Sequence, residues 1–231
     1  MRPMIFVAAL LLFTETASAQ TRELPLLSTA GVELHNVTAT PAELRGKKGL
    51  RVTFDSTHAQ AVLSGQAEPD QLIRVEGLEF SSGVIEVEAA GSPAPGAFAG
   101  ARGFVGLAFR LQPDWKTYDA FYIRPTNGRA EDQERRNHAT QYISHPSWTW
   151  NRLRSESPSK YESYADVVPD EWTKLRIEVR GDHARLYVNG NEQPSLVVND
   201  VKSGASAKGA VALWIGAGTI GYFRNLRIES R

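Results

Sequence analysis

The sequence predicts an all-β protein built from short antiparallel strands. Short runs rich in branched and aromatic residues recur along the chain, and Pro, Gly or Asn separates nearly every pair of them. In residues 174–179 (KLRIEV) charged and apolar residues alternate, which is typical of a strand with one buried and one solvated face. No longer stretch shows the apolar stripe of an amphipathic helix. This pattern favours an antiparallel sandwich or barrel.

The expected strands follow a polar N-terminal lead. They cover residues 49–54, 72–75, 83–88, 104–110, 120–124, 172–180, 184–188, 196–198, 210–215 and 222–229, and residues 61–63 are expected to continue a neighbouring strand. Residues 91–103 are rich in Gly, Ala and Pro, and we interpret them as a surface loop because both flanks resemble strands of one sheet system. Asn189 and Gly190 directly follow a strand and predict a tight turn.

The first 19 residues have the layout of a secretory signal peptide. Arg2 precedes an apolar run at 5–13, and small residues at 17–19 precede Gln20. The apolar run is shorter than the roughly 20 residues that span a bilayer, and no later segment is apolar enough to do so. We therefore expect a secreted or periplasmic protein whose residues 20–231 form a single domain with no integral membrane segment.

Composition excludes several classes of function. Lys and Arg together number 26 and balance 26 Asp and Glu, so the chain is formally neutral. Neutrality argues against binding to nucleic acid and to anionic membrane surfaces, which attract basic proteins. The chain has no cysteine, which excludes disulfides, thiol chemistry and cysteine-ligated metal sites.

The C-terminal part carries a specific pattern. Trp172, LRIEVRG, ARLYVNG, a Gly before VALWIG, and YFRNLRIE follow one another in that order, and GVIEVE with FVGLAFR precedes them. These motifs resemble the concanavalin A-like lectin/glucanase (laminin G-like) jelly rolls over residues 49–229. The pattern is also similar to the 3-keto-disaccharide hydrolase domain family, and FYIRPTNGR with RRNHATQY resembles a group of secreted bacterial proteins with this fold. The resemblance implies an antiparallel two-sheet β-sandwich with a concave sheet, and a carbohydrate ligand.

One departure from the related glycoside hydrolase family 16 bears on chemistry. That family carries Glu-x-Asp-x-x-Glu on one strand, whereas Glu86 and Glu88 here lack the later carboxylate. Retaining hydrolysis by that machinery is therefore not expected. The resemblance also implies that a structural calcium is common among relatives, although no cluster of Asp demonstrates one here. His138 and His145 stand seven residues apart without a compact ligand set, so no cofactor or transition-metal site is predicted.

Side-chain alternation predicts which residues share the concave face. In FVGLAFR, the large apolar residues should face the core, which leaves small residues and Arg110 on the open face. The same reasoning places Tyr122, Arg124 and Trp214 on that face, where an aromatic ring can stack against a sugar. For Trp214, ordinary packing under a loop is an equal alternative.

Residues 136–143 (RNHATQYI) allow two assignments. One parity presents Arg136, His138 and Tyr142 to the ligand, and the other presents Gln141 with Ile143. We favour the first, because Ile143 suits the core, and a register slip or bulge would invert it. His138 on such a face is a candidate for acid–base chemistry or ligand binding, against the commoner role of a structural histidine.

Residues 125–170 form a long excursion between strands, and long ordered loops often carry binding function. With the preceding strand, this region holds six of the twelve Trp and Tyr residues, together with six Arg. Its candidates for ligand contact or catalysis are Asn127, Trp150, Arg154, Glu162 and Asp166. For Trp150 we favour anchoring of the loop to the sandwich, and the arginines can instead pair with neighbouring acids.

Three functions remain open from the sequence. The first is a carbohydrate-binding jelly roll that stacks a glycan on Tyr122 and Trp214. The second is a carbohydrate-active enzyme: a polysaccharide lyase that uses His138 or Tyr142 with Gln141 and Arg124, or a glycoside hydrolase that uses Glu162 with Asp166. The third is a non-enzymatic interaction module of the cell envelope. The sequence does not indicate the oligomeric state.

Overall fold

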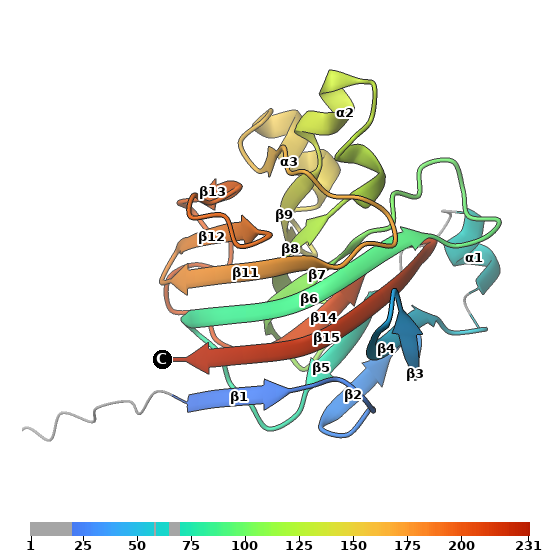
Figure 1. Cartoon of the computed structure of the whole chain (residues 1–231). Helices are drawn as coiled ribbons and strands as arrows, with labels where there is room; N and C mark the ends of the chain where they lie inside the picture. The colour runs from blue at the N-terminus through green and yellow to red at the C-terminus, as the bar shows by residue number, and fades with distance from the viewer. Residues whose placement is uncertain (1–19, 58, 65–69) are drawn as a thin grey trace, which may run out of the picture.

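The computed structural model describes residues 20–57, 59–64 and 70–231. It is an antiparallel two-sheet β-sandwich with short helices around its edge (Figure 1), which confirms the predicted fold class. The expected signal peptide falls on residues 1–19 and lies outside the described residues. No helix in the described part of the chain is long and apolar enough to cross a membrane.

Sheet A is the eight-stranded sheet. Its order is β13 (Leu196–Val198), β12 (His183–Val188), β11 (Thr173–Arg180), β6 (Gly83–Pro93), β15 (Thr219–Ser230), β4 (Lys47–Phe54) and β3 (Val37–Leu44), with β1 (Gln20–Leu24) also paired to β15. The turn after β12 contains Asn189 and Gly190 at φ of 55° and 76°, the left-handed backbone that its sequence predicts.

Sheet B is the seven-stranded sheet that carries the site. Its order is β10 (Glu162–Ser163), β9 (Thr140–His145), β8 (Tyr118–Ile123), β7 (Val105–Leu111), β14 (Ala210–Ile215), β5 (Gln71–Val75) and β2 (Val32–His35). The helical segments are α1 (Ala59–Ser64), the 3₁₀ turn η1 (Pro125–Asn127), α2 (Gln133–Asn137) and α3 (Trp150–Glu156). The last three belong to the excursion beside sheet B.

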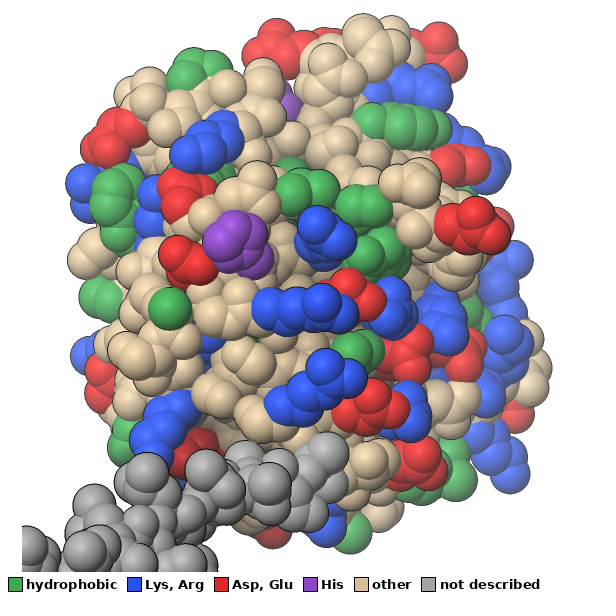
Figure 2. Space-filling view, turned by 90° about the vertical axis from the view of Figure 1, so that its left-hand side faces the viewer, with side chains coloured by type: hydrophobic (Ala, Val, Ile, Leu, Met, Phe, Trp, Pro, Cys, Tyr) green, Lys and Arg blue, Asp and Glu red, His purple; other side chains and the backbone are tan. Residues whose placement is uncertain are grey.

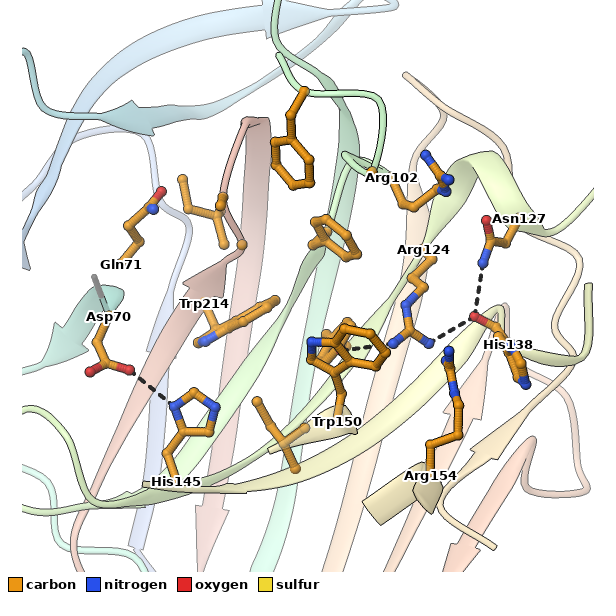
Figure 3. Close-up of a pocket in the computed structure, with 18 of the residues that line it drawn as sticks. Asp70, Gln71, Arg102, Arg124, Asn127, His138, His145, Trp150, Arg154 and Trp214 are labelled. Carbon is orange, nitrogen blue, oxygen red and sulfur yellow. Dashed lines mark hydrogen bonds and ion pairs between the residues drawn. The ribbon is translucent and has the colours of Figure 1, made fainter. Parts of the chain in front are cut away.

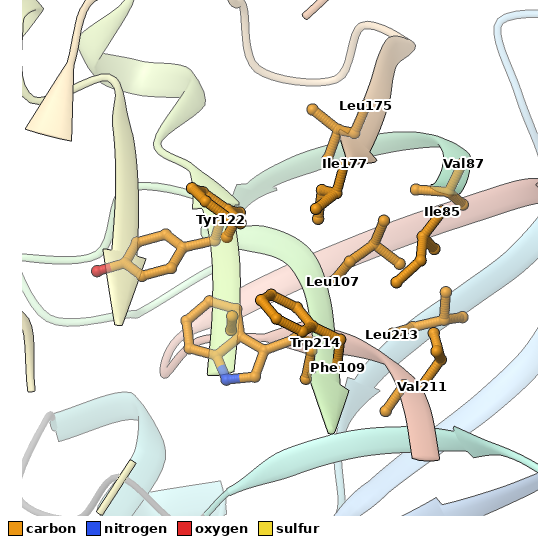
Figure 4. Close-up of a cluster of buried hydrophobic side chains, with 14 of the residues drawn as sticks. Ile85, Val87, Leu107, Phe109, Tyr122, Leu175, Ile177, Val211, Leu213 and Trp214 are labelled. Carbon is orange, nitrogen blue, oxygen red and sulfur yellow. The ribbon is translucent and has the colours of Figure 1, made fainter. Parts of the chain in front are cut away.

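The core lies between the two sheets and follows the predicted alternation. Figure 4 shows apolar side chains of β6 and β11 facing those of β7 and β14; the labelled members of this layer are Ile85, Val87, Leu107, Phe109, Leu175, Ile177, Val211 and Leu213. Tyr122 and Trp214 lie on the opposite face of sheet B, as predicted. Burial of this layer is the main favourable term in folding.

The structure differs from the predicted elements at the N-terminal side. The polar N-terminal segment forms β1, β2 and β3, which the sequence does not predict. These strands pair with strands of the two sheets through backbone hydrogen bonds, and such bonds do not require alternating apolar side chains. Residues 61–63 belong to helix α1 and not to a strand. The backbone amide of Phe98 donates to the carbonyl of Leu63 at 2.7 Å, which ties α1 to the loop after β6.

The outer face of sheet A is covered by charge pairs. Glu86 on β6 lies within 3.8 Å of Lys174 and Arg176 on β11, and within 3.7 Å of Arg227 on β15. Figure 2 shows Lys and Arg side chains interleaved with Asp and Glu on one flank of the molecule. Such mixed pairs keep the surface solvated and contribute little each to stability.

Candidate functional site

A cavity of about 340 Å³ lies on the outer face of sheet B. Residues of strands β5, β14, β8 and β9 form its floor, and the loop after β6 and the excursion form its walls. Its size falls within the range of roughly 300–1,000 Å³ that is typical of small-molecule sites. Figure 3 shows two tryptophans in the middle of the cavity, a histidine and a carboxylate at one end, and arginines at the other.

The floor is a pair of stacked aromatic rings. Tyr122 on β8 and Trp214 on β14 have ring centroids 4.6 Å apart and an interplanar angle of 25°. Between them runs β7, where Gly106 pairs with both residues. A Cβ at Gly106 would lie 2.1 Å from the carbonyl oxygen of Phe121 and 2.6 Å from the Cα of Tyr122. Only glycine therefore allows the strand to pass beneath the rings.

Trp150 forms part of the cavity wall. It begins α3 and leaves 39% of its surface exposed, with the guanidinium of Arg154 4.8 Å from its ring centre. Our prediction that Trp150 anchors the loop is therefore wrong. The helical turn aims the indole at the cavity, and the anchoring contact comes from Leu153, which is buried.

The histidine end joins three residues from three elements. Tyr118 on β8 donates its hydroxyl proton to Asp70 Oδ1 at 2.6 Å and accepts from Trp214 Nε1 at 3.1 Å. Nδ1 of His145, at the end of β9, lies 3.0 Å from the Tyr118 hydroxyl and 3.2 Å from Asp70 Oδ1. Burial and the nearby Asp70 raise the pKa of Tyr118 well above its ordinary value.

These contacts determine the tautomer of His145. The Tyr118 proton is used by Asp70, so both neighbours of Nδ1 offer only oxygen lone pairs, and Nδ1 must carry the imidazole proton. Nε2 is then the basic nitrogen. Figure 3 shows the His145 ring with this second nitrogen on the side facing Trp150. An imidazole oriented by a carboxylate in this way is suited to act as a general base.

The opposite end is built around Arg124. Its Nη2 donates to the Tyr122 hydroxyl at 3.0 Å and to Gln141 Oε1 at 2.9 Å, and its Nη1 donates to the His138 carbonyl at 3.0 Å. Asn127 donates to the same carbonyl at 3.2 Å. Arg124 is 5% exposed, so it is a fixed positive charge beside the aromatic floor.

Below this end lies a group of charged side chains around the buried Glu162. Arg154 makes a bidentate pair with Glu162 on β10, and His138 Nε2 lies 3.0 Å from Glu162 Oε2. Burial lowers the pKa of His138, the charges of Arg154 and Arg124 lower it further, and Glu162 opposes them. The His138 imidazole is therefore neutral near pH 7, and Glu162 holds it and Arg154 in place.

Two residues predicted for the concave face point into the sandwich instead. Arg110 has φ of 57° at a β-bulge opposite β14, which turns it to the other face. There it is 1% exposed and donates to carbonyls of Ser81, Gly181 and Gly204. It joins loops at the end of the sandwich and does not line the cavity.

The prediction that Tyr142 faces the ligand is wrong, because Tyr142 lies on the inward face of β9. Helix α2 ends at Asn137 and the strand starts at Thr140, so alternation cannot be carried from His138 into β9. Tyr142 is fully buried and donates to Asp119 Oδ1 at 2.6 Å, and burial raises its pKa. Ile143 faces the cavity instead.

The remaining predicted residues divide between the cavity and its surroundings. Asp166 is exposed and paired with Arg129 at 2.7 Å, so it is not a partner of Glu162 in a two-carboxylate site. Arg136 lies over the ring of Tyr164 at 5.2 Å and does not line the cavity. Gln141 is buried and holds Arg124. The predicted residues that do line the cavity are Tyr122, Arg124, Asn127, His138, Trp150, Arg154 and Trp214.

Sequence reasoning missed Asp70, Tyr118, His145, Arg102 and Arg135. The alternation that presents Gln141 and Ile143 on one face also places His145 on that face. This alternation was the sequence pattern that could have predicted His145. Asp70 precedes β5 far away in sequence, so only the sheet order brings it to His145. In the described residues, no three His, Asp or Glu side chains gather as metal ligands would.

The comparisons with solved structures agree with this architecture. The chain is similar to a carbohydrate-binding module, CBM66 from Bacillus subtilis, at 14% identity and a TM-score of 0.50, covering 84% of this chain and 96% of that one. It is similar to a Bacillus subtilis protein of unknown function with a galectin-like fold, at 12% identity and a TM-score of 0.55, covering 93% and 96%. The Crh5 transglycosylase matches at 14% identity and a TM-score of 0.50, covering 91% and 84%. At these identities the likeness concerns the fold.

No curated protein sequence matches this chain. A sequence model of the 3-keto-alpha-glucoside-1,2-lyase-like domain matches residues 41–229, which include β4 through most of β15 and every residue of the cavity described above. This match confirms the resemblance that the C-terminal motifs indicated. The chain therefore belongs to the 3-keto-alpha-glucoside-1,2-lyase-like domain family.

Proposed function

We propose that this protein binds a carbohydrate in the cavity on sheet B and eliminates its glycosidic substituent, with His145 as the base. The observation that carries the proposal is the Asp70–His145 pair beside an aromatic floor. A sugar ring offers apolar C–H faces to Trp214 and Trp150, and its hydroxyl groups suit the charged ends. The family to which the chain belongs is described by the same class of reaction.

The chemistry uses a sugar with a ketone at C3, next to the C–H bond at C2. Nε2 of His145 takes the C2 proton, and the electron pair moves toward the ketone oxygen. The C1–O bond then breaks, the C1=C2 double bond forms, and the imidazolium returns its proton to the departing oxygen. Atoms and electrons balance without a co-reactant.

Glycoside hydrolysis by two carboxylates has less support. Such enzymes use two carboxyl groups on either side of the scissile bond. Glu162 is held by Arg154 and His138, and Asp166 is held by Arg129 outside the cavity. The described cavity wall has one carboxylate, Asp70, and it orients an imidazole.

A glycan-binding protein without catalysis is the second candidate. The exposed Trp150 favours it, because an exposed indole at a cavity mouth is an adaptable stacking surface. The carbohydrate-binding module similar in fold belongs to this class by its description. Binding without product release distinguishes this candidate from the lyase, and the absence of both would favour an interaction module of the cell envelope.

The test uses p-nitrophenyl 3-keto-α-glucoside and the absorbance of released p-nitrophenol. We expect release by the wild type and a loss of about 10²–10⁴-fold in His145→Ala, the contribution of a general base. The matched control is His183→Ala, because His183 is exposed on β12 of the other sheet. Unchanged turnover in His145→Ala would overturn the assignment of the base. Quenching of tryptophan fluorescence by the sugar without release would identify the binding protein instead.

We also propose that residues 1–19 direct export of the protein. The basic start, the apolar run and the small residues before Gln20 support this proposal. Expression of the full chain in a bacterium, followed by N-terminal sequencing of the periplasmic product, tests it. A product that keeps residues 1–19 would contradict it.

A further inference from the structure

Three arginines meet at the end of the cavity opposite His145. Arg102 comes from the loop after β6, Arg124 follows β8, and Arg135 comes from α2. Figure 3 shows Arg102 and Arg124 on the same side of the cavity, next to Asn127. Arg135 Nη2 lies 3.4 Å from Asn127 Oδ1, and Asn127 shares the His138 carbonyl with Arg124, so the three elements are linked.

These arginines contact only neutral acceptors within the described part of the chain. Arg102 Nη1 donates to the carbonyls of Ala99 at 2.6 Å and Ala101 at 3.0 Å, and its Nε and Nη2 make no hydrogen bond there. The side chain of Arg135 has only two contacts among the described residues, both long, at 3.4 and 3.5 Å. Arg124 is bound to a phenol, an amide and a carbonyl. Elsewhere on the molecule, arginines commonly pair with carboxylates, as Arg129 and Arg152 do.

Within the described residues, none of the three guanidinium groups forms an ion pair with a carboxylate. Asp132, at the start of α2, accepts from the backbone amide of Arg135 at 3.1 Å and so caps the helix. Glu162 is held by Arg154 and His138, and Asp70 is at the far end of the cavity. Burial lowers the pKa of Arg102, and the positive charges of Arg135 and Arg124 lower it further. Like charges held together without a counter-charge destabilise the protein until an anion joins them.

We infer that this end of the cavity binds an anionic group on the sugar, a carboxylate or a phosphate. Guanidinium groups match both groups through parallel N–H donors. Arg124 supplies a fixed positive charge at this site. Arg102 and Arg135 have N–H donors that are free to bind the anionic group. The inference rests on the proposed function, since it specifies the charge of the sugar that the aromatic floor holds.

The division of the cavity supports this assignment. The aromatic rings lie between the arginines and His145, so a sugar stacked on them has one edge at each end (Figure 3). A charged substituent on one edge would fix the direction of the ring and bring the opposite edge toward Nε2 of His145. The arginines then select the substrate and orient it, and His145 carries out the chemistry.

The experiment compares matched sugars by isothermal titration calorimetry at low and high salt. Methyl α-glucoside is the neutral probe, and methyl α-glucuronide and methyl α-glucoside 6-phosphate are the two anionic arms. We expect at least one anionic sugar to bind about 10-fold more tightly than the neutral one, the effect of one charge-assisted hydrogen bond. Added salt should weaken the anionic binding alone. The anionic sugar that binds more tightly shows whether the site prefers a carboxylate or a phosphate.

The variant Arg135→Gln should remove most of that preference, so that the anionic and neutral sugars bind to it with similar affinity. Its matched control is Arg136→Gln, one residue along α2, which lies over Tyr164 outside the cavity. Arg135 is exposed, so its replacement does not threaten folding. Equal affinity for neutral and anionic sugars would overturn this inference and leave the proposed function standing. Binding of none of the three sugars would also overturn this inference, whereas turnover of the keto glucoside would still decide the proposed function.

Discussion

Replacement of Tyr142 by Phe separates a structural role from a catalytic one. The Tyr142 hydroxyl donates to Asp119 Oδ1 at 2.6 Å and accepts from the backbone amide of Lys202 at 2.8 Å. Asp119 is fully buried, and within the described residues its Oδ2 has no hydrogen-bond partner. Tyr142→Phe therefore leaves a buried carboxyl group without a donor, which costs about 2–4 kcal/mol of unfolding free energy.

Urea unfolding followed by tryptophan fluorescence measures this loss, with turnover of the keto glucoside measured on the folded variant. The control is Tyr164→Phe, because Tyr164 is 41% exposed and its hydroxyl has one contact at 3.4 Å. Its expected change is within about 0.5 kcal/mol. Full stability with lost turnover in Tyr142→Phe would refute the reasoning and return Tyr142 to the site.

The same geometry predicts the alkaline limit of stability. Burial, followed by the nearby Asp119, raises the pKa of Tyr142 above its ordinary value of 10.0. Above that pH the unfolded chain releases the phenol proton while the folded chain keeps it, so the unfolding free energy falls as pH rises. The fall should be shallower in Tyr142→Phe. An equal slope in both proteins would show that Tyr142 does not titrate on unfolding.

Three further results are expected from other parts of the structure. Burial opposes ionisation of Asp200, yet three hydrogen bonds from lysine and tyrosine side chains lower its pKa to about 2. Its contribution to stability is complete above pH 3.8 and is lost as pH falls toward 2; with 39% of the side chain exposed, Asp200→Asn costs about 1 kcal/mol or less in an acid-unfolding series. Nuclear magnetic resonance titration of His138 should give a pKa below 6.5, and Glu162→Gln should lower it further because Glu162 opposes the shift; a rise would contradict the ion pair. Gly106→Ala should cost about 1–3 kcal/mol and weaken sugar binding by displacing Tyr122, and unchanged binding would show that the floor tolerates the shift.

The fold could be predicted because apolar residues alternate with other residues in the strands that have one face toward the core and the other toward the cavity or solvent. Residues 105–109 and 211–215 present their large side chains to the core as expected, and the same alternation placed Tyr122 and Trp214 together. The N-terminal strands were not predictable, because edge strands gain their stability from pairing and show little apolar pattern.

Errors in the site arose where local backbone geometry interrupts alternation. Arg110 sits at a bulge with a left-handed backbone, and Tyr142 follows a short helix whose end resets the parity. No pattern along the chain marks either event. The pairing of Asp70 with His145 depends on strand order in sheet B, which joins residues 75 positions apart. Local periodicity in the sequence therefore cannot predict the contact between Asp70 and His145.

The origin of each charged group suggests how the two ends of the cavity divide their roles. His145 ends a strand of sheet B and Asp70 precedes another, so the sheet fixes their distance. Arg102 and Arg135 come from a loop and a short helix, which tolerate changes of length and composition that strands do not. Substitutions in the excursion and in the loop after β6 should therefore alter which sugar binds, while His145 keeps its geometry. Substitutions beneath the aromatic floor should reduce turnover for every sugar alike.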